Sequence, residues 1–563
     1  MAKQWKAVLA AIIGIASVVT VYLLTGIFFE TNDDRIISEI LSGSFTGQAE
    51  SRVVYVNFLL SVVLKGLYQV SVEVPWYGLY LVLQHILCLT MVLYSVYELC
   101  DSKKKLLVGS VLTLSVFLSH IYLVGQIQYT STAALLAMTG YVCLMFTRDH
   151  KKSLVRFAVF EILAILLRQD AMLMIQPLGL SVYLGMIVIA SLPLKDKVRK
   201  AAVIVGMLGG IWLIFFAGNW IGYYEKGWHE YDKFNDAGVM MYDYHGFAEY
   251  AEVQDILKQY RVSENEYEAY AKYAVLEGNL TAECAEELAD YVAFKQDVNR
   301  PDLKAVVMQL IHTALFQYTW GMNVVTLYAW CVAVFVVILY KNIRLLVPIL
   351  GLGCSHIVIW GYLLYRGRTP LRITLPLFLC ETMLLFSIVV LQCNGKQRNR
   401  MKAWLLAGVC GIFCLLGMKA FSVQVDFLKE SNSNQAYYIE GMETLHRYCD
   451  ERPSNKYLLE ANTMNYYRGS ALETEIYGPH NNVITGGWYS YSPPMRERIH
   501  CYLEGYRNGV HLIIQDDGRL KEHPTVRYLS EVTGSEPVKK DSIALQHGGN
   551  CVVYYFAAPE EKK

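Results

Sequence analysis

Two adjacent carboxylates, Asp33 and Asp34, follow the first long apolar run of the chain. That run, residues 7–29, carries no charge and is long enough to cross the roughly 30 Å hydrocarbon core of a bilayer. The pair therefore emerges at the lipid–water boundary, where charged groups are costly to place. Such carboxylates can act as a general base or position a nucleophile. Together with Asp243 they could also hold a divalent cation, although no ligand spacing demands one.

The same carboxylates also fit a structural role. Asn32 could cap a short helix over residues 33–42, with Asp33 and Asp34 in its first turn, where carboxylates interact favourably with the helix dipole. The two interpretations are compatible, and both are retained. The apolar face of this helix would consist of Ile36, Ile37, Ile40 and Leu41.

Arginines gather at two other boundaries between apolar runs. Arg168 and Asp170 separate one pair of runs, and Arg366, Arg368 and Arg372 lie in a single turn between another pair. Basic residues favour the cytoplasmic side of a membrane, so arginines at outer turns point to a function. Guanidinium groups bind phosphate through two parallel hydrogen bonds, which predicts phosphate binding here. The alternative is an Arg168–Asp170 ion pair with the remaining arginines at lipid headgroups.

Two outer segments combine aromatic rings with polar side chains. Residues 228–246, which include Asp243, mix rings with carboxylates and amides. This composition suits a carbohydrate, because rings stack on sugar faces while polar groups bind hydroxyls, and it is equally typical of a loop at headgroup level. Residues 481–491 end in an aromatic patch that could bind sugar or dock on the membrane domain.

The composition is that of a polytopic membrane protein. Of the 563 residues, 54% are hydrophobic and 18% are charged, and the mean hydropathy is +0.29. The formal net charge of zero gives no indication of nucleic-acid binding. The first apolar run is too long for a cleaved signal peptide and lacks a small-residue cleavage site, so we expect it to remain as an anchor.

Basic clusters set the predicted topology. Lys3 and Lys6 precede the first run, which predicts a cytoplasmic N-terminus, and the later clusters should face the same side. These clusters are residues 103–105, 148–152, 195–200, 341–344 and 396–402. About eleven transmembrane helices follow from this scheme, which puts the C-terminus outside the cytoplasm. The predicted spans are 7–29, 76–99, 106–124, 128–147, 154–168, 171–192, 201–221, 322–340, 345–364, 371–392 and 403–421.

Two further apolar stretches, 53–70 and 303–319, are expected to lie along the outer interface, with a re-entrant hairpin of 53–75 as the alternative. The outer parts of the chain are then the loops 30–75 and 222–321 and residues 423–563. The last part mixes helical patterns with short apolar strands. It is predicted to be an extracytoplasmic α/β or α+β domain that follows a transmembrane domain of residues 1–422.

This combination resembles the GT-C superfamily of membrane glycosyltransferases. The features shared are a first span followed at once by paired acids in Asn32-Asp33-Asp34, interfacial helices at 35–45 and 53–70, many spans, and a terminal outer domain. Protein O-mannosyltransferases and aminoarabinose transferases share this plan. The chain is more similar still to a bacterial branch found with surface-polysaccharide genes, through Phe234-Asn235, Asp243-Tyr244 and Tyr365-Arg366-Gly367-Arg368. The His-Pro-Pro signature of mannosyltransferases is absent, and residues 51–57 occupy that region, which leaves the sugar open.

The resemblance implies a hexosyl- or pentosyltransferase that moves a sugar from a polyprenyl-phosphate donor to a glycan, lipid or protein acceptor on the outer face of the cytoplasmic membrane. Asp33 or Asp34 would be the catalytic base. The leaving lipid phosphate would be stabilised by cations. The substrate-binding residues would be Arg52, Arg168, Asp170, Asp243, Arg366, Arg368 and Arg372. A lipid-linked oligosaccharide flippase or another transporter is the alternative, and a non-catalytic membrane scaffold is the third hypothesis.

Overall fold

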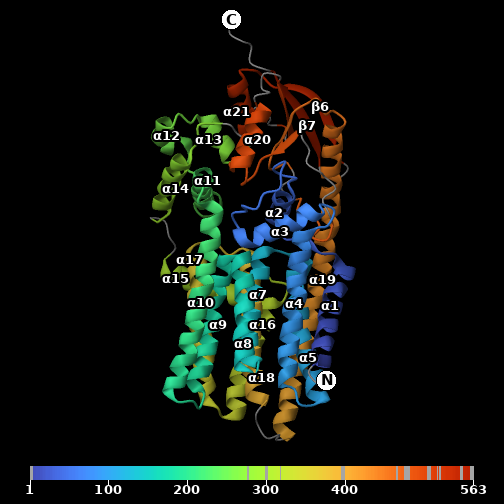
Figure 1. The fold of residues 1–563 in the computed structure, drawn as a ribbon, viewed down its shortest axis with the longest axis vertical. Coiled ribbons are helices and arrows are strands. Elements are labelled where there is room, and N and C mark those ends of the chain that lie inside the picture. Colours follow the sequence, from blue (N-terminus) through green and yellow to red (C-terminus); the bar gives the residue numbers. More distant parts are fainter. Residues whose placement is uncertain are drawn as a thin grey trace.

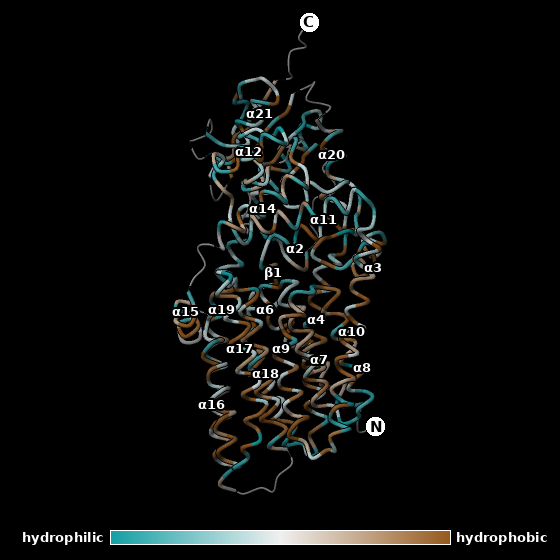
Figure 2. Tube along the Cα trace, turned by 90° about the vertical axis from the view of Figure 1, so that its left-hand side faces the viewer, coloured by the Kyte–Doolittle hydropathy of each residue, from teal (hydrophilic) through white to brown (hydrophobic). Residues whose placement is uncertain are grey.

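The computed structural model describes residues 4–274, 278–297, 302–316, 319–394, 400–463, 467–473, 482–503, 509–516, 518, 522–545 and 549–557. A bundle of long helices has the N-terminus at one end, and short helices and a sheet cover its other end (Figure 1). Apolar residues run along the helices of the bundle, whereas hydrophilic residues are concentrated in the part that carries the sheet (Figure 2).

Among the described residues, nine helices are long and apolar enough to cross a membrane, so the chain is a multi-pass membrane protein, as predicted. They are α1 (Gln4–Thr25), α4 (Trp76–Leu99), α7 (Tyr129–Phe146), α9 (Gln169–Ile189), α10 (Leu194–Tyr223), α16 (Met322–Tyr340), α17 (Leu346–Tyr365, preceded by the 3-10 turn η2, Ile343–Leu345), α18 (Leu371–Asn394) and α19 (Arg400–Asp450).

The other two predicted spans are helices that are shorter or more charged. The stretch 106–124 forms α5 (Lys103–Leu118), which has 16 residues, whereas a crossing needs about 20. The stretch 154–168 forms α8 (His150–Leu167), which carries several charged side chains. Both helices belong to the bundle, since α5 packs against α4 and α8 packs against α7.

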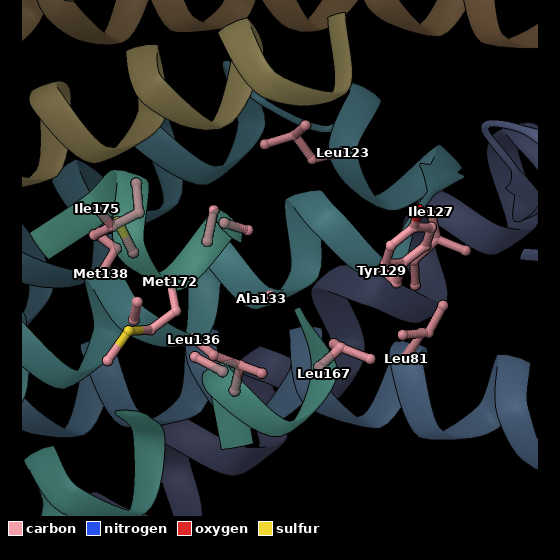
Figure 3. Close-up of a cluster of buried hydrophobic side chains, with 14 of the residues drawn as sticks. Leu81, Leu123, Ile127, Tyr129, Ala133, Leu136, Met138, Leu167, Met172 and Ile175 are labelled. Carbon is pink, nitrogen blue, oxygen red and sulfur yellow. The ribbon is translucent and has the colours of Figure 1, made fainter. Parts of the chain in front are cut away.

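Helix α7 is the centre of the bundle. All of its residues except Leu135 and Met145 are buried, as expected for a helix packed on every side. It contacts α4, α8, α9 and α18. Figure 3 shows the apolar side chains that meet around it, among them Leu81, Leu136, Leu167, Met172 and Ile175. Because α7 is held on all sides, its first residue, Tyr129, is a fixed point at the edge of the bundle.

A two-stranded parallel sheet ties the acidic loop to this fixed point. Strand β1 (Phe28–Phe29) pairs with β2 (Gln126–Ile127), which follows the short helix α6 (Tyr122–Gly125). The N–H of Glu30 then donates to the carbonyl oxygen of Ile127 at 3.0 Å. Since the strands are parallel, the residues after them leave in the same direction. Helix α2 (Asn32–Ser42) therefore begins beside the first turn of α7.

Helix α2 begins one residue earlier than predicted. Its N-cap is Thr31, in extended backbone with φ −129°, so Asn32 is the first helical residue and not the cap. The Thr31 hydroxyl makes no cap hydrogen bond and donates to Asp34 Oδ2 at 3.4 Å instead. The predicted apolar face is confirmed, because its four residues are buried: Ile36, Ile37, Ile40 and Leu41.

Short helices cover the end of the bundle that carries the acidic loop. The stretches 53–70 and 303–319 form α3 (Phe58–Val70) and α15 (Leu303–Phe316), which are too short to cross a membrane, and their interfacial placement stays a prediction. Residues 317 and 318 lie outside the described residues. Figure 1 shows α3 where the bundle meets the part that carries the sheet, and Figure 2 shows α15 at the side of the bundle. The remaining elements of this region are α11 (Lys226–Val239), the π-helix η1 (Met240–His245), α12 (Tyr250–Gln259), α13 (Glu264–Tyr270) and α14 (Ala282–Asp297).

The C-terminal part contains the predicted mixture of helices and strands. Its five-stranded sheet has the order β4-β3-β5-β7-β6, in which β4, β3 and β5 are parallel and β7 is antiparallel to both of its neighbours. The strands are β3 (Tyr457–Leu459), β4 (Val483–Thr485), β5 (Val510–Gln515), β6 (Val538–Ala544) and β7 (Asn550–Phe556), and the helices are α20 (Pro493–Leu503) and α21 (Pro524–Thr533). Helix α19 runs without a break through position 422, where the sequence suggested a domain boundary, and that boundary stays a prediction.

Buried amides hold α19 against the rest of the bundle. Gln424 donates to the carbonyl oxygen of Ser119 at 2.8 Å and accepts from the N–H of Tyr122 at 2.9 Å. Eight residues later, Asn432 donates to the carbonyl oxygen of Thr25 at 2.7 Å. Buried polar groups need such partners, so these bonds fix the rotation of α19. The sheet that follows α19 is thereby placed over the acidic loop.

Candidate functional site

Asp33 lies where two cavities meet. One cavity, of about 390 Å³, faces the bundle and is called the arginine cavity below. The other, of about 320 Å³, faces the C-terminal sheet and is called the sheet cavity. Most of the residues predicted for the site line the arginine cavity: Asp33, Arg168, Asp170, Asp243, Arg368 and Arg372.

Arg168 is placed by the break between α8 and α9. Its backbone is extended, with φ −159°, so it ends one helix and precedes the next. Its guanidinium pairs with Asp170 at 2.9 Å. The same group lies over the rings of Tyr55 and Tyr129, at 5.0 and 5.5 Å from their centroids. The predicted ion pair is thus present, and Arg168 lines the cavity as well.

Asp243 reaches the cavity from the π-helix η1, a type of helix often found at functional sites. Its carboxylate pairs with Arg368 at 2.8 Å. The next residue, Tyr244, lies under two guanidiniums, at 4.5 Å from Arg368 and 4.7 Å from Arg366. Arg366 is therefore beside the arginine cavity but is not part of its lining.

Arg372 differs from the other arginines of the cavity. It lies in the first turn of α18 and lines the cavity, yet within the described part of the chain no carboxylate pairs with it. Its charge nevertheless acts on Asp33. Arg168 and Arg368 each have a carboxylate partner, so Arg372 has the most capacity left for an anionic ligand.

The surroundings of Asp33 suit a general base. Burial raises the pKa of its carboxyl, and the nearby charge of Asp243 acts in the same direction. The guanidinium of Arg372 opposes this shift most strongly, with smaller contributions from Arg168 and Arg368. A carboxylate with a raised pKa accepts a proton more readily than an ordinary aspartate, while the cations favour its ionised form.

Asp34 has a different environment. Its side chain is fully buried and lines neither cavity. Its Oδ1 accepts hydrogen bonds from the hydroxyl of Tyr77 at 2.8 Å and from the backbone N–H of Tyr129 at 3.0 Å. Burial raises its pKa well above the ordinary value. Asp34 thus joins α2 to α4 and α7, and this arrangement fixes the position of its neighbour Asp33.

Arg52 lies outside both cavities. Its guanidinium donates to the carbonyl oxygen of Gly222 at 2.9 Å, pairs with Glu225 at 3.1 Å and lies 4.9 Å from the ring centroid of Trp228. These partners come from the outer end of α10 and the start of α11. Arg52 therefore connects the segment 30–75 with the segment 222–321.

Two aromatic residues line both cavities: Tyr273, which was not expected from the sequence, and Trp488, which belongs to the aromatic patch of residues 481–491. Tyr273 lines both cavities and has φ 55°, a conformation that is strained for a residue other than glycine and is often found at functional sites. Trp488 also lines both cavities, and the centroid of its ring lies 4.8 Å from the centroid of the Tyr55 ring. No local pattern marks Tyr273 as a site residue, because its neighbours in space come from distant parts of the chain.

The aromatic patch within residues 482–491 docks on the membrane domain. The hydroxyl of Tyr489 donates to the carbonyl oxygen of Arg52 at 2.8 Å, and that of Tyr231 donates to the carbonyl oxygen of Trp488 at 3.2 Å. These contacts with the segments 30–75 and 222–321 agree with the docking interpretation, and sugar binding by this segment stays a prediction. The docking also brings Trp488 to the cavities.

The carboxylates near the cavities do not form a metal-ligand set. Within the described ranges, no three His, Cys, Asp or Glu side chains are grouped closely enough to hold a metal ion. Asp34 accepts hydrogen bonds from Tyr77 and Tyr129, and Asp243 pairs with Arg368. Asp33, Asp34 and Asp243 were considered together for a divalent cation. Two of them, Asp34 and Asp243, are bound to different partners.

Comparison with known proteins gives structural neighbours only. No protein-family model matches the sequence, and no curated protein matches it. The chain is similar to ArnT from Cupriavidus metallidurans bound to undecaprenyl phosphate, with a TM-score of 0.40, 10% identity, and 100% of both chains covered. For the apo state of the same protein, the TM-score is 0.36 and the identity 11%, over 98% of this chain and 99% of the other. At these values the neighbours do not indicate which residues of this chain act.

Proposed function

We propose that the protein is a membrane glycosyltransferase that moves a sugar, a hexose or a pentose, from a polyprenyl-phosphate donor to an acceptor on the outer face of the cytoplasmic membrane. The observation that carries the proposal is the presence of Asp33 and Arg372 in one cavity. A base with a raised pKa and an arginine without a carboxylate partner are the two groups that such a transfer requires.

The position of the arginine cavity suits a lipid-linked donor. Ala171 and Met174, from the first turns of α9, and Ile373, from the first turn of α18, line it together with Arg168, Arg368 and Arg372, so apolar residues of two spanning helices and the cations share one cavity. A polyprenyl chain can remain in the bilayer while its phosphate reaches the cations at the boundary. The sugar would then extend toward Asp33.

In the proposed step, the Asp33 carboxylate takes the proton from an acceptor hydroxyl. The acceptor oxygen attacks the anomeric carbon, and the bond between that carbon and the phosphate oxygen breaks. The electron pair leaves with the polyprenyl phosphate, and the configuration at the anomeric carbon inverts. Arg372 would bind the leaving phosphate, together with Arg168 and Arg368, where negative charge develops.

The remaining predicted residues would act indirectly. Asp170 and Asp243 hold Arg168 and Arg368 in place through their ion pairs. Arg366 would help to hold Tyr244, because its guanidinium lies 4.7 Å from the centroid of that ring. Asp34 is assigned a positioning role, because its oxygen is bound by Tyr77 and Tyr129.

The distribution of basic residues supports an outer location of the site. Lys6 donates to the carbonyl oxygens of Tyr97 and Cys100 at 2.7 and 2.8 Å, and Arg148 donates to that of Leu99 at 3.5 Å, so these basic segments share one end of the bundle. Helix α2 lies at the opposite end (Figure 1). By the positive-inside tendency, the N-terminus would be cytoplasmic and Asp33 extracytoplasmic. Residues 396–399 of the last basic cluster lie outside the described residues.

The test is an assay of purified protein in nanodiscs with a panel of polyprenyl-phosphate sugars and candidate acceptors. We expect wild-type protein to release free polyprenyl phosphate and Asp33→Asn to release almost none. Asp290→Asn, an exposed position on α14, is the matched control and should behave as wild type. If folded wild-type protein releases nothing from any donor, the proposal is wrong. Movement of an intact lipid-linked oligosaccharide across a vesicle membrane would then establish a flippase.

A further inference from the structure

The sheet cavity opens at the carboxyl ends of two parallel strands. Ala461 and Asn462 follow β3, Thr485 ends β4, and α2 with Asp33 forms the opposite wall. In open sheets with parallel strands, ligands bind outside the carboxyl ends of the strands where the strand order reverses, and here β4 and β5 lie on opposite sides of β3. The sheet cavity therefore has the position of a ligand site, although the mechanism proposed above leaves it without an occupant.

The lining of the sheet cavity matches a carbohydrate. Glu460 and the side-chain oxygen of Asn462 accept hydrogen bonds, and the Thr485 hydroxyl both donates and accepts them, as sugar hydroxyls require. The buried Glu460 carboxylate is held in place by the N–H and the side-chain amide of Asn462, at 2.9 and 3.0 Å. The rings of Phe45 and Trp488 offer apolar faces on which a sugar ring can stack.

Anionic ligands are a poor match for this cavity. Its two arginines already have partners: Arg35 pairs with Glu39, and Arg498 donates to the carbonyl oxygens of Phe45 at 2.6 Å and Val483 at 3.2 Å. Arg372 in the arginine cavity has no such carboxylate partner among the described residues. A phosphate would therefore favour the arginine cavity, and an uncharged ligand would favour the sheet cavity.

A lipid tail is also a poor match. Of the spanning helices, only the outer part of α19 contributes to the described lining, through Met442 and His446. The part of its lining that the structure describes therefore has no apolar wall that continues into the bundle. An acceptor bound here would present a polar carbohydrate part, whatever it is attached to at a distance.

We propose that the sheet cavity binds the acceptor and that the bound part is an uncharged carbohydrate; this inference rests on the proposed function. Both cavities share Asp33, Tyr273, Gly487 and Trp488, so they meet at the base itself. In-line displacement needs the attacking oxygen and the leaving phosphate on opposite sides of the anomeric carbon. With donor phosphate in the arginine cavity and acceptor in the sheet cavity, the acceptor hydroxyl gives its proton to Asp33 and its oxygen forms the new glycosidic bond as the phosphate departs.

The first experiment measures binding without a donor. Neutral hexose and N-acetylhexosamine oligosaccharides that carry a photoreactive diazirine are cross-linked to the protein in nanodiscs. Cross-links are expected at residues 459–462 and 485–488, and Ala461→Trp should remove them by filling the cavity. Ala544→Trp, on the exposed face of the edge strand β6, is the matched control and should retain them. Cross-links confined to the arginine cavity, or none from any oligosaccharide of the panel, would overturn the inference.

The second experiment separates acceptor from donor kinetics. Thr485→Val keeps the shape of the side chain and removes one hydroxyl. We expect a KM for the acceptor that is about fivefold to tenfold higher, the effect of one lost hydrogen bond, with little change in the KM for the donor. Thr20→Val, on the lipid-facing side of α1, is the control.

The two proposals fail in different ways. If Thr485→Val changes only the KM for the donor, the assignment of the sheet cavity is wrong while the transferase function stands. If wild-type protein releases no polyprenyl phosphate, the function proposed above is wrong. In that case the cross-linking result alone decides whether the cavity binds carbohydrate.

Discussion

The backbone N–H of Tyr129, the first residue of α7, donates to Oδ1 of Asp34 at 3.0 Å. The same oxygen accepts from the hydroxyl of Tyr77 on α4 at 2.8 Å. Through one carboxylate, the acidic loop is thus bound to two helices of the bundle. Asp33 and Asp34 are adjacent in sequence but differ in role, because Asp34 is occupied by these bonds while Asp33 lines the cavities.

Loss of the Asp34 contacts should destabilise the protein. Tyr77→Phe removes one hydrogen bond and should cost about 1 kcal/mol in the free energy of unfolding. Asp34→Ala leaves the buried N–H of Tyr129 and the hydroxyl of Tyr77 without their acceptor, and should cost about 2–5 kcal/mol. The variants are ranked by thermal stability. Each is heated, and the folded protein that remains is quantified by size-exclusion chromatography. Tyr224→Phe, at an exposed ring, should match wild type, and an Asp34→Ala protein of wild-type stability would contradict the structural role.

Removal of the base should act on the rate and not on folding. Asp33→Asn retains the size of the side chain and is expected to lower kcat by about 10²–10⁴-fold, the usual contribution of a positioned general base. Asp33→Glu should retain part of the activity, because the carboxylate is kept but displaced. Turnover is measured as release of polyprenyl phosphate, with Asp290→Asn as control. Equal rates for Asp33→Asn and wild type would exclude Asp33 as the base.

Arg372 should determine the use of the donor. Arg372→Gln removes the cavity arginine that lacks a carboxylate partner among the described residues, and should lower kcat/KM for the donor by about 10²-fold. Arg372→Lys should recover part of this loss, since the charge is kept but the planar pair of donors is not. Arg344→Gln, at an exposed residue of η2, serves as the control. If Arg372→Gln has the wild-type kcat/KM for the donor, the donor phosphate binds elsewhere.

The pH dependence of kcat/KM should report on Asp33. Its pKa is raised above 3.8 by burial, and Arg372 opposes the shift. Activity requires the ionised carboxylate, so it is lost as the pH falls through this pKa, and the acid limb should lie above that of an ordinary aspartate. Arg372→Gln removes the largest opposing charge, so its acid limb should move to higher pH. A limb that moves to lower pH, or that moves equally in Arg344→Gln, would contradict this electrostatic link.

Much of the lining of the arginine cavity could be predicted because charges at a bilayer edge are costly and therefore conspicuous in sequence. Asp33, Arg168 and Arg372 stand at the ends of long apolar runs, and the structure brings them to one cavity. Asp243 was found through the composition of its segment. Such residues are visible because their local sequence contrasts with the membrane-spanning helices beside them.

The other features depend on contacts between distant segments. Arg52 was expected near substrate, but its partner Glu225 lies far along the chain, and no local pattern reveals that pair. Trp488 reaches the cavities because the C-terminal sheet is folded back over residues 32–45, whereas Tyr273 is held by stacking on Tyr242, 31 residues earlier in the chain. The start of α2 was misplaced by one residue because Asn32 is a good capping residue, whereas Thr31 holds the extended backbone that precedes the helix.

The unbroken course of α19 has a mechanical consequence. Its 51 residues extend for about 75 Å, and the part from Lys402, beside Tyr340 in the bundle, to His446, in the wall of the sheet cavity, spans about 66 Å. A helix of this length bends only gently, so it sets the height of that wall above the bilayer. The length of α19 thus fixes how far the sheet cavity lies from the bundle. If the sheet cavity binds the acceptor, as proposed above, only acceptors whose hydroxyl reaches Asp33 from the bilayer would react, so the length of α19 would select acceptors by reach as well as by chemistry.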